Sequence, residues 1–262
     1  SWWRVMSQLA WLNGKLLSYE AASLDASGWP TGSGTFETVK TVTGQPWALS
    51  RHMRRALNTA RRNDHPFPGE ELIRRAVAEV IAANQFAIGR LRILFGDDGS
   101  LCVTHQEYFE LTKPAILGIR DHAFASNRIV EKRYPYDQYL QLLKEAQNAG
   151  FDDFLQINSQ GYVSETSIAN LVVQINGSWV TPPLSDGVLP GVMRALLIEK
   201  NGVLVRRIKA DELPLITNGF VVSSLKIAQP IAEIEGRSLQ ISKESEQMRS
   251  RFAATALATS VG

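Results

Sequence analysis

The chain has 262 residues, of which 44% are hydrophobic and 21% charged, enough apolar material for one large core or two modest ones. Lysine and arginine number 28 against 26 acids, a formal charge of +2, which argues against nucleic acid as a partner. The single cysteine, Cys102, excludes an internal disulfide and a multi-cysteine zinc site, and we expect it to be a small buried hydrophobe. The four histidines show no ligand spacing, so we expect no metal.

The sequence gives no sign of membrane attachment. Its apolar runs fall short of the roughly 20 residues that span a bilayer. The start, Trp2-Trp3-Arg4, lacks the ordered charged, apolar and small-residue series of a targeting signal. We therefore expect a cytoplasmic protein with no membrane partner.

The first half predicts strands and two helices. Strands are expected at residues 9–17, around an Asn13-Gly14 hairpin turn, and at 39–42 after the glycine-rich stretch 31–38. A second turn is expected at 43–45. The periods of residues 50–62 and 69–84 predict amphipathic helices, the second with an apolar stripe that includes Leu72. A further strand is expected at 91–95, before a turn at 97–99.

The poor periodicity of residues 113–132 indicates a long irregular connection, and we place a domain boundary near 119–130. The prediction is a small N-terminal α/β domain of residues 1–120 and a larger C-terminal α/β domain of residues 121–262. The fold class is therefore mixed α and β in two parts.

The second half predicts a helix that starts near Tyr136 and is closed by Gly150. Turns at 159–161 and 176–177 are expected to join antiparallel neighbours among strands 154–157, 171–175 and 179–181. The remaining expected elements are a helix at 191–199, a strand at 204–208, a short helix at 211–216 and a strand at 220–223.

Pattern alone offers several candidate sites, each with an ordinary structural alternative. Gly32 and Gly34 could cradle a phosphate or form a tight turn. The arginines of residues 51–62 could bind an anion or form a solvated helix face. Gly191 stands at a helix start, where free N–H groups attract anions, but helix capping explains it equally well. Lys132 and Glu165 are single residues of common types, so each could be an ordinary surface lysine or strand carboxylate.

The combination is more specific, because these pieces occur in the order and approximate spacing of a known family. The matching pieces are Gly32-x-Gly34-x-Phe36-Glu37-Thr38, His52-x-x-Arg55, Lys132 with Tyr136, Glu165-x-x-x-x-Asn170, Thr181-Pro182-Pro183, Leu189-Pro190-Gly191-x-x-Arg194 and Ser223-Ser224-Leu225. Over nearly its whole length the chain resembles the class IV aminotransferases, which are fold type IV pyridoxal-phosphate enzymes. The resemblance implies a two-domain, D-amino-acid-aminotransferase-like fold, a homodimer, and pyridoxal 5'-phosphate in a cleft between the domains.

The resemblance also implies residue roles. Lys132 resembles the lysine that attaches the cofactor covalently and then acts as base, which requires an amine of lowered pKa. Glu165 resembles the carboxylate that pairs with the protonated pyridine nitrogen, and Arg55 the arginine whose planar fork binds the phosphate.

The rest of the implied cofactor site comes from the C-terminal half. The backbone N–H groups of Val192 and Met193 and the hydroxyl of Ser224 would complete the phosphate cup. Tyr136 matches the tyrosine that can hydrogen-bond the cofactor's ring oxygen.

Within the family, the chain looks most like the aminodeoxychorismate lyases. It is short for a branched-chain enzyme, and residues 96–100 lack the Arg-x-His pair by which D-amino-acid enzymes hold a carboxylate. Residues 179–196 and 223–226 resemble the corresponding lyase segments. The implied reaction eliminates pyruvate from 4-amino-4-deoxychorismate to give 4-aminobenzoate, a folate precursor. The alternatives are an aminotransferase of branched-chain or D-amino acids and an inactive relative that binds a phosphorylated ligand.

The lyase interpretation adds further candidates. Thr38 matches a hydroxyl position that assists proton delivery to the leaving pyruvate. Because the substrate carries two carboxylates, Arg92, Arg133 and Lys226 are candidate substrate-binding residues, with surface charge as the alternative. Arg133-Tyr134-Pro135 stands where family members more often have small or polar residues, and Pro135 would constrain the backbone beside Lys132.

Overall fold

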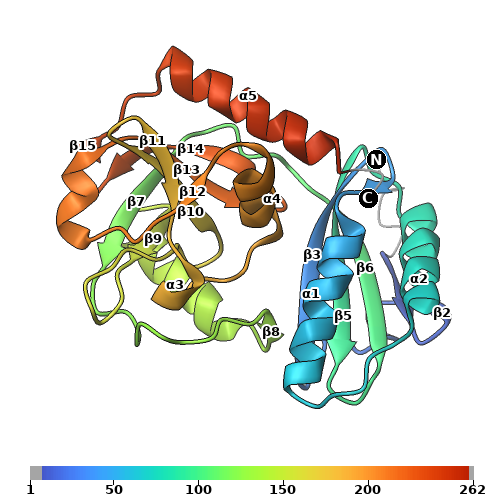
Figure 1. Ribbon diagram of the computed structural model, residues 1–262. Coiled ribbons are helices and arrows are strands. Elements are labelled where there is room, and N and C mark those ends of the chain that lie inside the picture. Colours follow the sequence, from blue (N-terminus) through green and yellow to red (C-terminus); the bar gives the residue numbers. More distant parts are fainter. Residues whose placement is uncertain (1–7, 260–262) are drawn as a thin grey trace. The chain divides into compact units, whose positions relative to one another are not determined.

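The computed structural model describes residues 8–259, which form two units (Figure 1). Unit 1 contains residues up to 109 together with 131–135, and unit 2 contains residues 110–130 and 136–259. The expected division at 120/121 stays a prediction. The start Trp2-Trp3-Arg4 lies outside the described residues.

Within the described part of the chain, unit 1 has a seven-stranded sheet in the order β2-β1-β6-β5-β3-β4, with β8 on β3. Its strands are β1 Leu9–Leu12, β2 Lys15–Ser18, β3 Gly34–Val42, β4 Gln45–Pro46, β5 Ile88–Gly96, β6 Leu101–Glu107 and β8 Arg133–Tyr134. All these pairs are antiparallel. The hairpin predicted at Asn13-Gly14 is confirmed: both residues have positive φ, which a tight β1–β2 turn requires.

Two helices cover one face of this sheet, and both are confirmed nearly to the residue as α1 Leu49–Arg62 and α2 Glu70–Ala83. The buried stripe of α2 begins at Ile73 and continues through Ala76, Val77, Val80 and Ile81. Leu72 is 39% exposed and does not belong to it, because one residue turns a helix by about 100° away from its buried line.

Among its described residues, unit 2 contains a second sheet of eight strands. Their order is β12-β11-β10-β13-β14-β7-β9, with β15 on β14. The strands are β7 Ala115–Arg120, β9 Asp153–Gln156, β10 Asn170–Ile175, β11 Ser178–Thr181, β12 Leu204–Val205, β13 Ile216–Ser223, β14 Ile227–Ile234 and β15 Arg237–Ser238. The helices are α3 Asp137–Asn148, α4 Val192–Lys200 and α5 Lys243–Leu257, with 3-10 turns η1 Leu184–Asp186 and η2 Ala210–Leu215.

One predicted pairing in unit 2 is wrong. The turn at 159–161 does not join antiparallel neighbours among the long strands, because β9 pairs in parallel with β7 while β10 pairs with β11 and β13. The turn closes only a local antiparallel bridge, Ile157 to Val163. A turn signal fixes the local reversal of the chain, and the partner β7 lies in the stretch that showed no clear period. The Asn176-Gly177 hairpin between β10 and β11 is confirmed.

Other elements differ in extent. The expected strand 204–208 is paired only as β12, and the expected helix 211–216 is a 3-10 turn with Pro214 inside it. Proline has no N–H and clashes with a continuing α-helix, which favours the shorter form. Pattern did not indicate β6, β7, β14 or α5.

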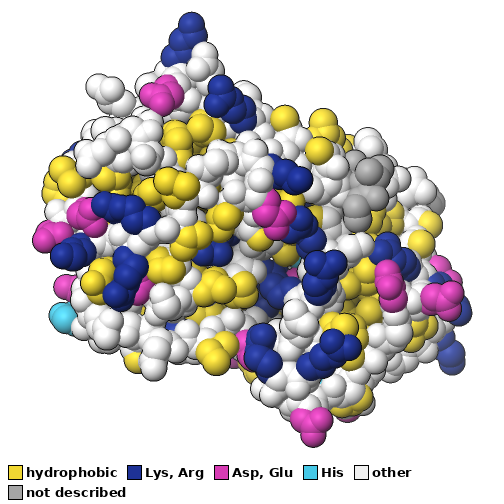
Figure 2. All heavy atoms as spheres, in the orientation of Figure 1, with side chains coloured by type: hydrophobic (Ala, Val, Ile, Leu, Met, Phe, Trp, Pro, Cys, Tyr) yellow, Lys and Arg dark blue, Asp and Glu magenta, His cyan; other side chains and the backbone are white. Residues whose placement is uncertain are grey.

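Composition is reflected in two simple ways. Basic and acidic side chains are interspersed over the face seen in Figure 2. Cys102 is buried as expected, and burial raises the pKa of its thiol to about 12, which disfavours the reactive thiolate. In residues 8–259, none of the helices has the length and apolar character needed to cross a membrane.

Candidate active site

Glu37 is a buried carboxylate of β3 that faces α1. Nε of Arg55 donates to both of its oxygens, at 2.9 and 3.1 Å, and Nη2 of Arg55 lies 2.8 Å from Oε1. Nδ1 of His52 lies 3.0 Å from the same Oε1 and carries the proton of that bond, since an ionised carboxylate can only accept. His52 and Arg55 stand three residues apart on one helix face, so the His52-x-x-Arg55 spacing brings both to one carboxylate.

The electrostatics of this group make Glu37 an anion. Burial alone raises the pKa of Glu37, but the charge of Arg55 and the hydrogen bond from His52 outweigh it and hold the pKa below its usual value. Burial lowers the pKa of His52, and the charges of Arg55 and Lys132 act in the same direction. Lys132 is therefore within electrostatic range of His52.

Lys132 is held to the sheet of unit 1 by its neighbours on β3. The N–H of Phe36 donates to the Lys132 carbonyl at 3.0 Å, and Nζ of Lys132 lies 4.7 Å from the centre of the Phe36 ring. Trp29 supports that ring edge-on at 5.0 Å. The structure thus places Lys132 against Phe36 and Arg55 against Glu37, the next residue of β3.

Thr38 and Arg92 are opposite residues on β3 and β5. Because side chains alternate along a strand, Thr38 shares a face with Phe36, and Glu37 points to the other. Arg92 is buried: its guanidinium stacks 3.9 Å from the centre of the Trp29 ring, and Nη1 donates to the Ser27 carbonyl at 2.9 Å. Two sequence candidates are therefore adjacent on the sheet face that carries the Phe36 ring.

Arg133, the second substrate-binding candidate, makes a two-point ion pair with Asp97. Nη1 donates to Oδ1 at 2.6 Å and Nη2 to Oδ2 at 2.7 Å. Sequence pattern assigned Asp97 only to a turn, and it gave no sign of a partner 36 residues away.

Glu165 of unit 2 is a buried carboxylate with fixed donors. Oε2 accepts from the Leu189 N–H at 2.9 Å and from Nδ2 of Asn170 at 3.1 Å. Nη2 of Arg128 lies 3.6 Å from Oε1, and the Arg128 guanidinium stacks on Phe124. The motif contains Asn170 but gives it no role. Arg128 lies in the stretch without period, where sequence carried no signal for it.

The same asparagine connects Glu165 to the start of α4. Nδ2 of Asn170 also donates to the Leu189 carbonyl at 3.0 Å, and its Oδ1 would lie 2.0 Å from a Cβ on Gly191. Only glycine allows this approach. Gly191 caps α4, and the first N–H groups of a helix, here those of Val192 and Met193, have no acceptor within it. Glu165, Asn170 and this helix start form one cluster.

The remaining candidates of unit 2 are Tyr136, Ser224 and Lys226. Tyr136 stacks at 4.9 Å on Tyr139, which lies within electrostatic range of Arg128 and Glu165. Ser224 follows β13 and is half-buried. Nζ of Lys226 donates to Gln229 at 2.8 Å, and burial lowers the pKa of this lysine.

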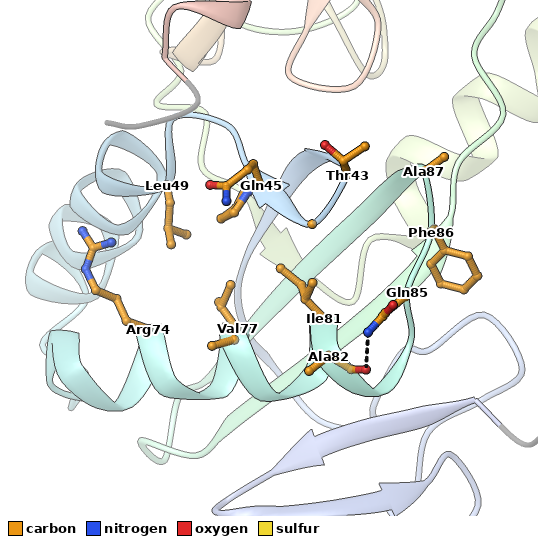
Figure 3. Close-up of a pocket in the computed structure, with 13 residues that line it drawn as sticks. Thr43, Gln45, Leu49, Arg74, Val77, Ile81, Ala82, Gln85, Phe86 and Ala87 are labelled. Carbon is orange, nitrogen blue, oxygen red and sulfur yellow. Dashed lines mark hydrogen bonds between the residues drawn. The ribbon is translucent and has the colours of Figure 1, made fainter.

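A groove of about 840 Å³ in unit 1 lies elsewhere (Figure 3). It runs along α2, and its walls include Leu49, Val77, Ile81 and Phe86. None of the residues that line it is a predicted site residue. The groove is mainly apolar and does not coincide with the clusters around Glu37 and Glu165.

The sequence model described as amino-transferase class IV matches residues 34–234 of the chain. The chain therefore belongs to the class IV aminotransferase family, whose members are enzymes that depend on pyridoxal phosphate. The resemblance expected from the motifs is confirmed, and so is the expected cofactor at the level of the family.

Curated relatives carry two kinds of name. A Schizosaccharomyces pombe protein, provisionally named an aminodeoxychorismate lyase, is 28% identical over 214 residues, which are 76% of this chain and 91% of that protein. A Methanocaldococcus jannaschii protein, provisionally named a branched-chain-amino-acid aminotransferase, is 23% identical over 92% of this chain and 94% of its own length.

Solved structures confirm the expected fold class. The branched-chain aminotransferase of Thermoproteus uzoniensis with norvaline has a TM-score of 0.82 at 22% identity and covers 97% of this chain and 96% of its own. A hypothetical aminotransferase of Mycobacterium tuberculosis with α-ketoglutarate and PMP has a TM-score of 0.84 at 20% identity and covers 95% and 99%. The chain has the fold type IV architecture.

Proposed function

We propose that the protein is a pyridoxal-phosphate-dependent 4-amino-4-deoxychorismate lyase, which eliminates pyruvate from its substrate and releases 4-aminobenzoate. The observation that carries this proposal is the similarity to the S. pombe protein of that name, which extends over 91% of that protein. The lyase-like segments at 179–196 and 223–226 support it. The proposal includes a homodimer in the cytoplasm that acts on a small amino and carboxylate substrate.

The chemistry of the donor set fits the cofactor. Arg55, Val192 and Met193 offer a guanidinium and helix N–H groups to a phosphate, and Ser224 adds a hydroxyl. Glu165 offers an acceptor held by Asn170 and Leu189 to the pyridine nitrogen. Tyr136 is assigned to the ring oxygen. When bound, pyridoxal phosphate supplies an electron sink for the carbon that carries the substrate's amine.

Lys132 and Thr38 are the proposed proton carriers. The Lys132 amine would hold the cofactor until the substrate amine takes its place, and it would then remove the proton at the carbon bearing nitrogen. Thr38, on the sheet face of the Phe36 ring over which Lys132 lies, delivers a proton to the departing pyruvate. The elimination is driven by aromatisation of the substrate's own ring. Arg92 and Lys226 stay the candidates for the substrate carboxylates.

The deciding experiment gives aminodeoxychorismate to purified protein loaded with pyridoxal phosphate, without any keto acid. Repeated formation of 4-aminobenzoate and pyruvate, with the cofactor spectrum preserved, is the expected result. No 4-aminobenzoate, but conversion to pyridoxamine phosphate on addition of an amino acid, would make the protein an aminotransferase, the function that the M. jannaschii name favours. Failure of both reactions would leave the inactive phospholigand-binding relative.

A further inference from the structure

Lys132 lies on a short segment that crosses from one unit to the other. Residues 131–135 belong to unit 1, although the chain before them, 110–130, and after them, 136–259, belongs to unit 2. The strand in this segment, β8, is only two residues long and pairs with β3 at Gly34 and Thr35. Because this two-residue pairing gives few backbone hydrogen bonds, side chains must help to hold residues 131–135 in place.

The ion pair of Arg133 and Asp97 is such a contact. Both Nη atoms of Arg133 donate to Asp97, one to each carboxylate oxygen. Asp97 is itself tied to the turn before β3: Oγ of Ser33 donates to Oδ2 at 2.7 Å, and the Asp97 N–H donates to the Ser33 carbonyl at 3.1 Å. Nδ1 of His65 lies 2.9 Å from Oδ1. A planar guanidinium with two parallel bonds fixes direction as well as distance.

The next residue fixes the segment from the other side. Tyr134 is 5% exposed and fits against Gly34, where a Cβ would lie 2.3 Å from the tyrosine hydroxyl and from the Phe95 carbonyl. Gly34 of the glycine-rich stretch thus makes room for the Tyr134 ring. Arg133 and Tyr134 hold the two faces of the strand that directly follows Lys132.

We propose that Arg133 is a positioning residue for Lys132: through Asp97 it locks residues 131–135 onto the sheet of unit 1 and so sets where the Lys132 amine lies. This inference rests on the proposed role of Lys132 but not on the identity of the substrate. It gives Arg133 a function other than binding a substrate carboxylate, namely the ion pair with Asp97, to which both of its Nη atoms donate.

The test measures cofactor attachment directly. Protein is mixed with pyridoxal phosphate and quenched with borohydride at set times, and the fraction of Lys132-containing peptide that carries cofactor is read by mass spectrometry. Arg133→Met and Asp97→Asn are expected to slow attachment about tenfold or more, since small displacements of a reacting group cost large factors in rate. The double variant is expected to be no slower than either single one, because the two residues act as a pair. Circular dichroism checks that each variant is folded.

Two further variants test whether the ion pair itself sets the attachment rate. The exchanged pair Arg133→Asp with Asp97→Arg is expected to recover at least part of the attachment rate. Arg249→Met, which breaks an exposed ion pair with Glu246 on α5, is the matched control and is expected to attach cofactor like the wild type.

Attachment at the wild-type rate in a folded Asp97→Asn variant would overturn the inference. So would a KM that rises in Arg133→Met with unchanged kcat and attachment, the result expected of a substrate contact. Neither result affects the lyase proposal. Failure of the lyase assay with normal attachment in the wild type would overturn that proposal and leave this one standing.

Discussion

Arg55 presents one edge of its guanidinium to Glu37: Nε and Nη2 both lie within 3.1 Å of the carboxylate. The anion therefore orients the planar group rather than only balancing its charge. We propose that the other edge of the guanidinium binds the cofactor phosphate. Glu37, from the glycine-rich motif, and Arg55, from the helix motif, are thus joined by a direct ion pair.

Arg55→Ala should weaken binding of pyridoxal phosphate by about 2 to 5 kcal/mol, because it removes a charged partner of the phosphate. Absorbance titration gives the dissociation constant. Pyridoxal, which lacks the phosphate, should lose little affinity, and Arg54→Ala, on the exposed side of the same helix, serves as the control. An equal loss for pyridoxal would show that Arg55 does not bind the phosphate.

Glu37→Gln should weaken cofactor binding less than Arg55→Ala does, by about 1 to 3 kcal/mol, because the arginine remains but loses its orienting anion. The same titration with pyridoxal phosphate and pyridoxal measures this. If the variant binds both ligands as the wild type does, Glu37 has no orienting role.

The free energy of unfolding should also depend on pH through Glu37. Its pKa is lower in the folded protein than the usual 4.5, so the unfolded chain binds its proton more readily. This carboxylate therefore stabilises the fold above about pH 4.5, and the contribution is lost as pH falls from there through the folded pKa. Denaturant unfolding at several values between pH 3 and 7 should show a shallower acid slope for Glu37→Gln. Parallel slopes would contradict the prediction.

The sequence predicted those secondary-structure elements whose signal lies within a few neighbouring residues. The helices α1 and α2 follow from a 3.6-residue period and the β1–β2 hairpin from Asn13-Gly14, since each signal lies within one short window. The sequence did not predict the helix α5, because its apolar stripe is too sparse. Of its 15 residues, only Ser245, Met248, Phe252 and Ala256 are buried.

In the candidate site, too, some residues could be predicted from the sequence and others could not. The residues of the motifs could be singled out because a resemblance ties each to a role. The partners that hold them could not, because Asp97 and Arg133 are 36 residues apart and Arg128 and Glu165 are 37 apart. Pairs of this kind depend on sheet order and loop path, which a linear pattern does not contain.

Lys132→Ala should abolish turnover, by at least about a thousandfold, while the protein stays folded, because the amine is both the attachment point and the base. Lys144→Ala, at an exposed position on α3, is the matched control. Product formation and circular dichroism are measured together. Substantial remaining activity in a folded Lys132→Ala protein would mean that another amine carries the reaction.

Thr38→Val should slow elimination without changing cofactor attachment. The proposed hydroxyl serves only the departing pyruvate, so the variant should make 4-aminobenzoate about a hundredfold more slowly, the size of a general-acid contribution. Cofactor attachment should stay normal, because the side chain is isosteric and half-buried. Thr38→Ser keeps a hydroxyl and should retain most of the rate. Equal rates for Thr38→Val and the wild type, or equal loss in Thr38→Ser, would remove the hydroxyl from the reaction and leave Lys132 as the one proton carrier the proposal names.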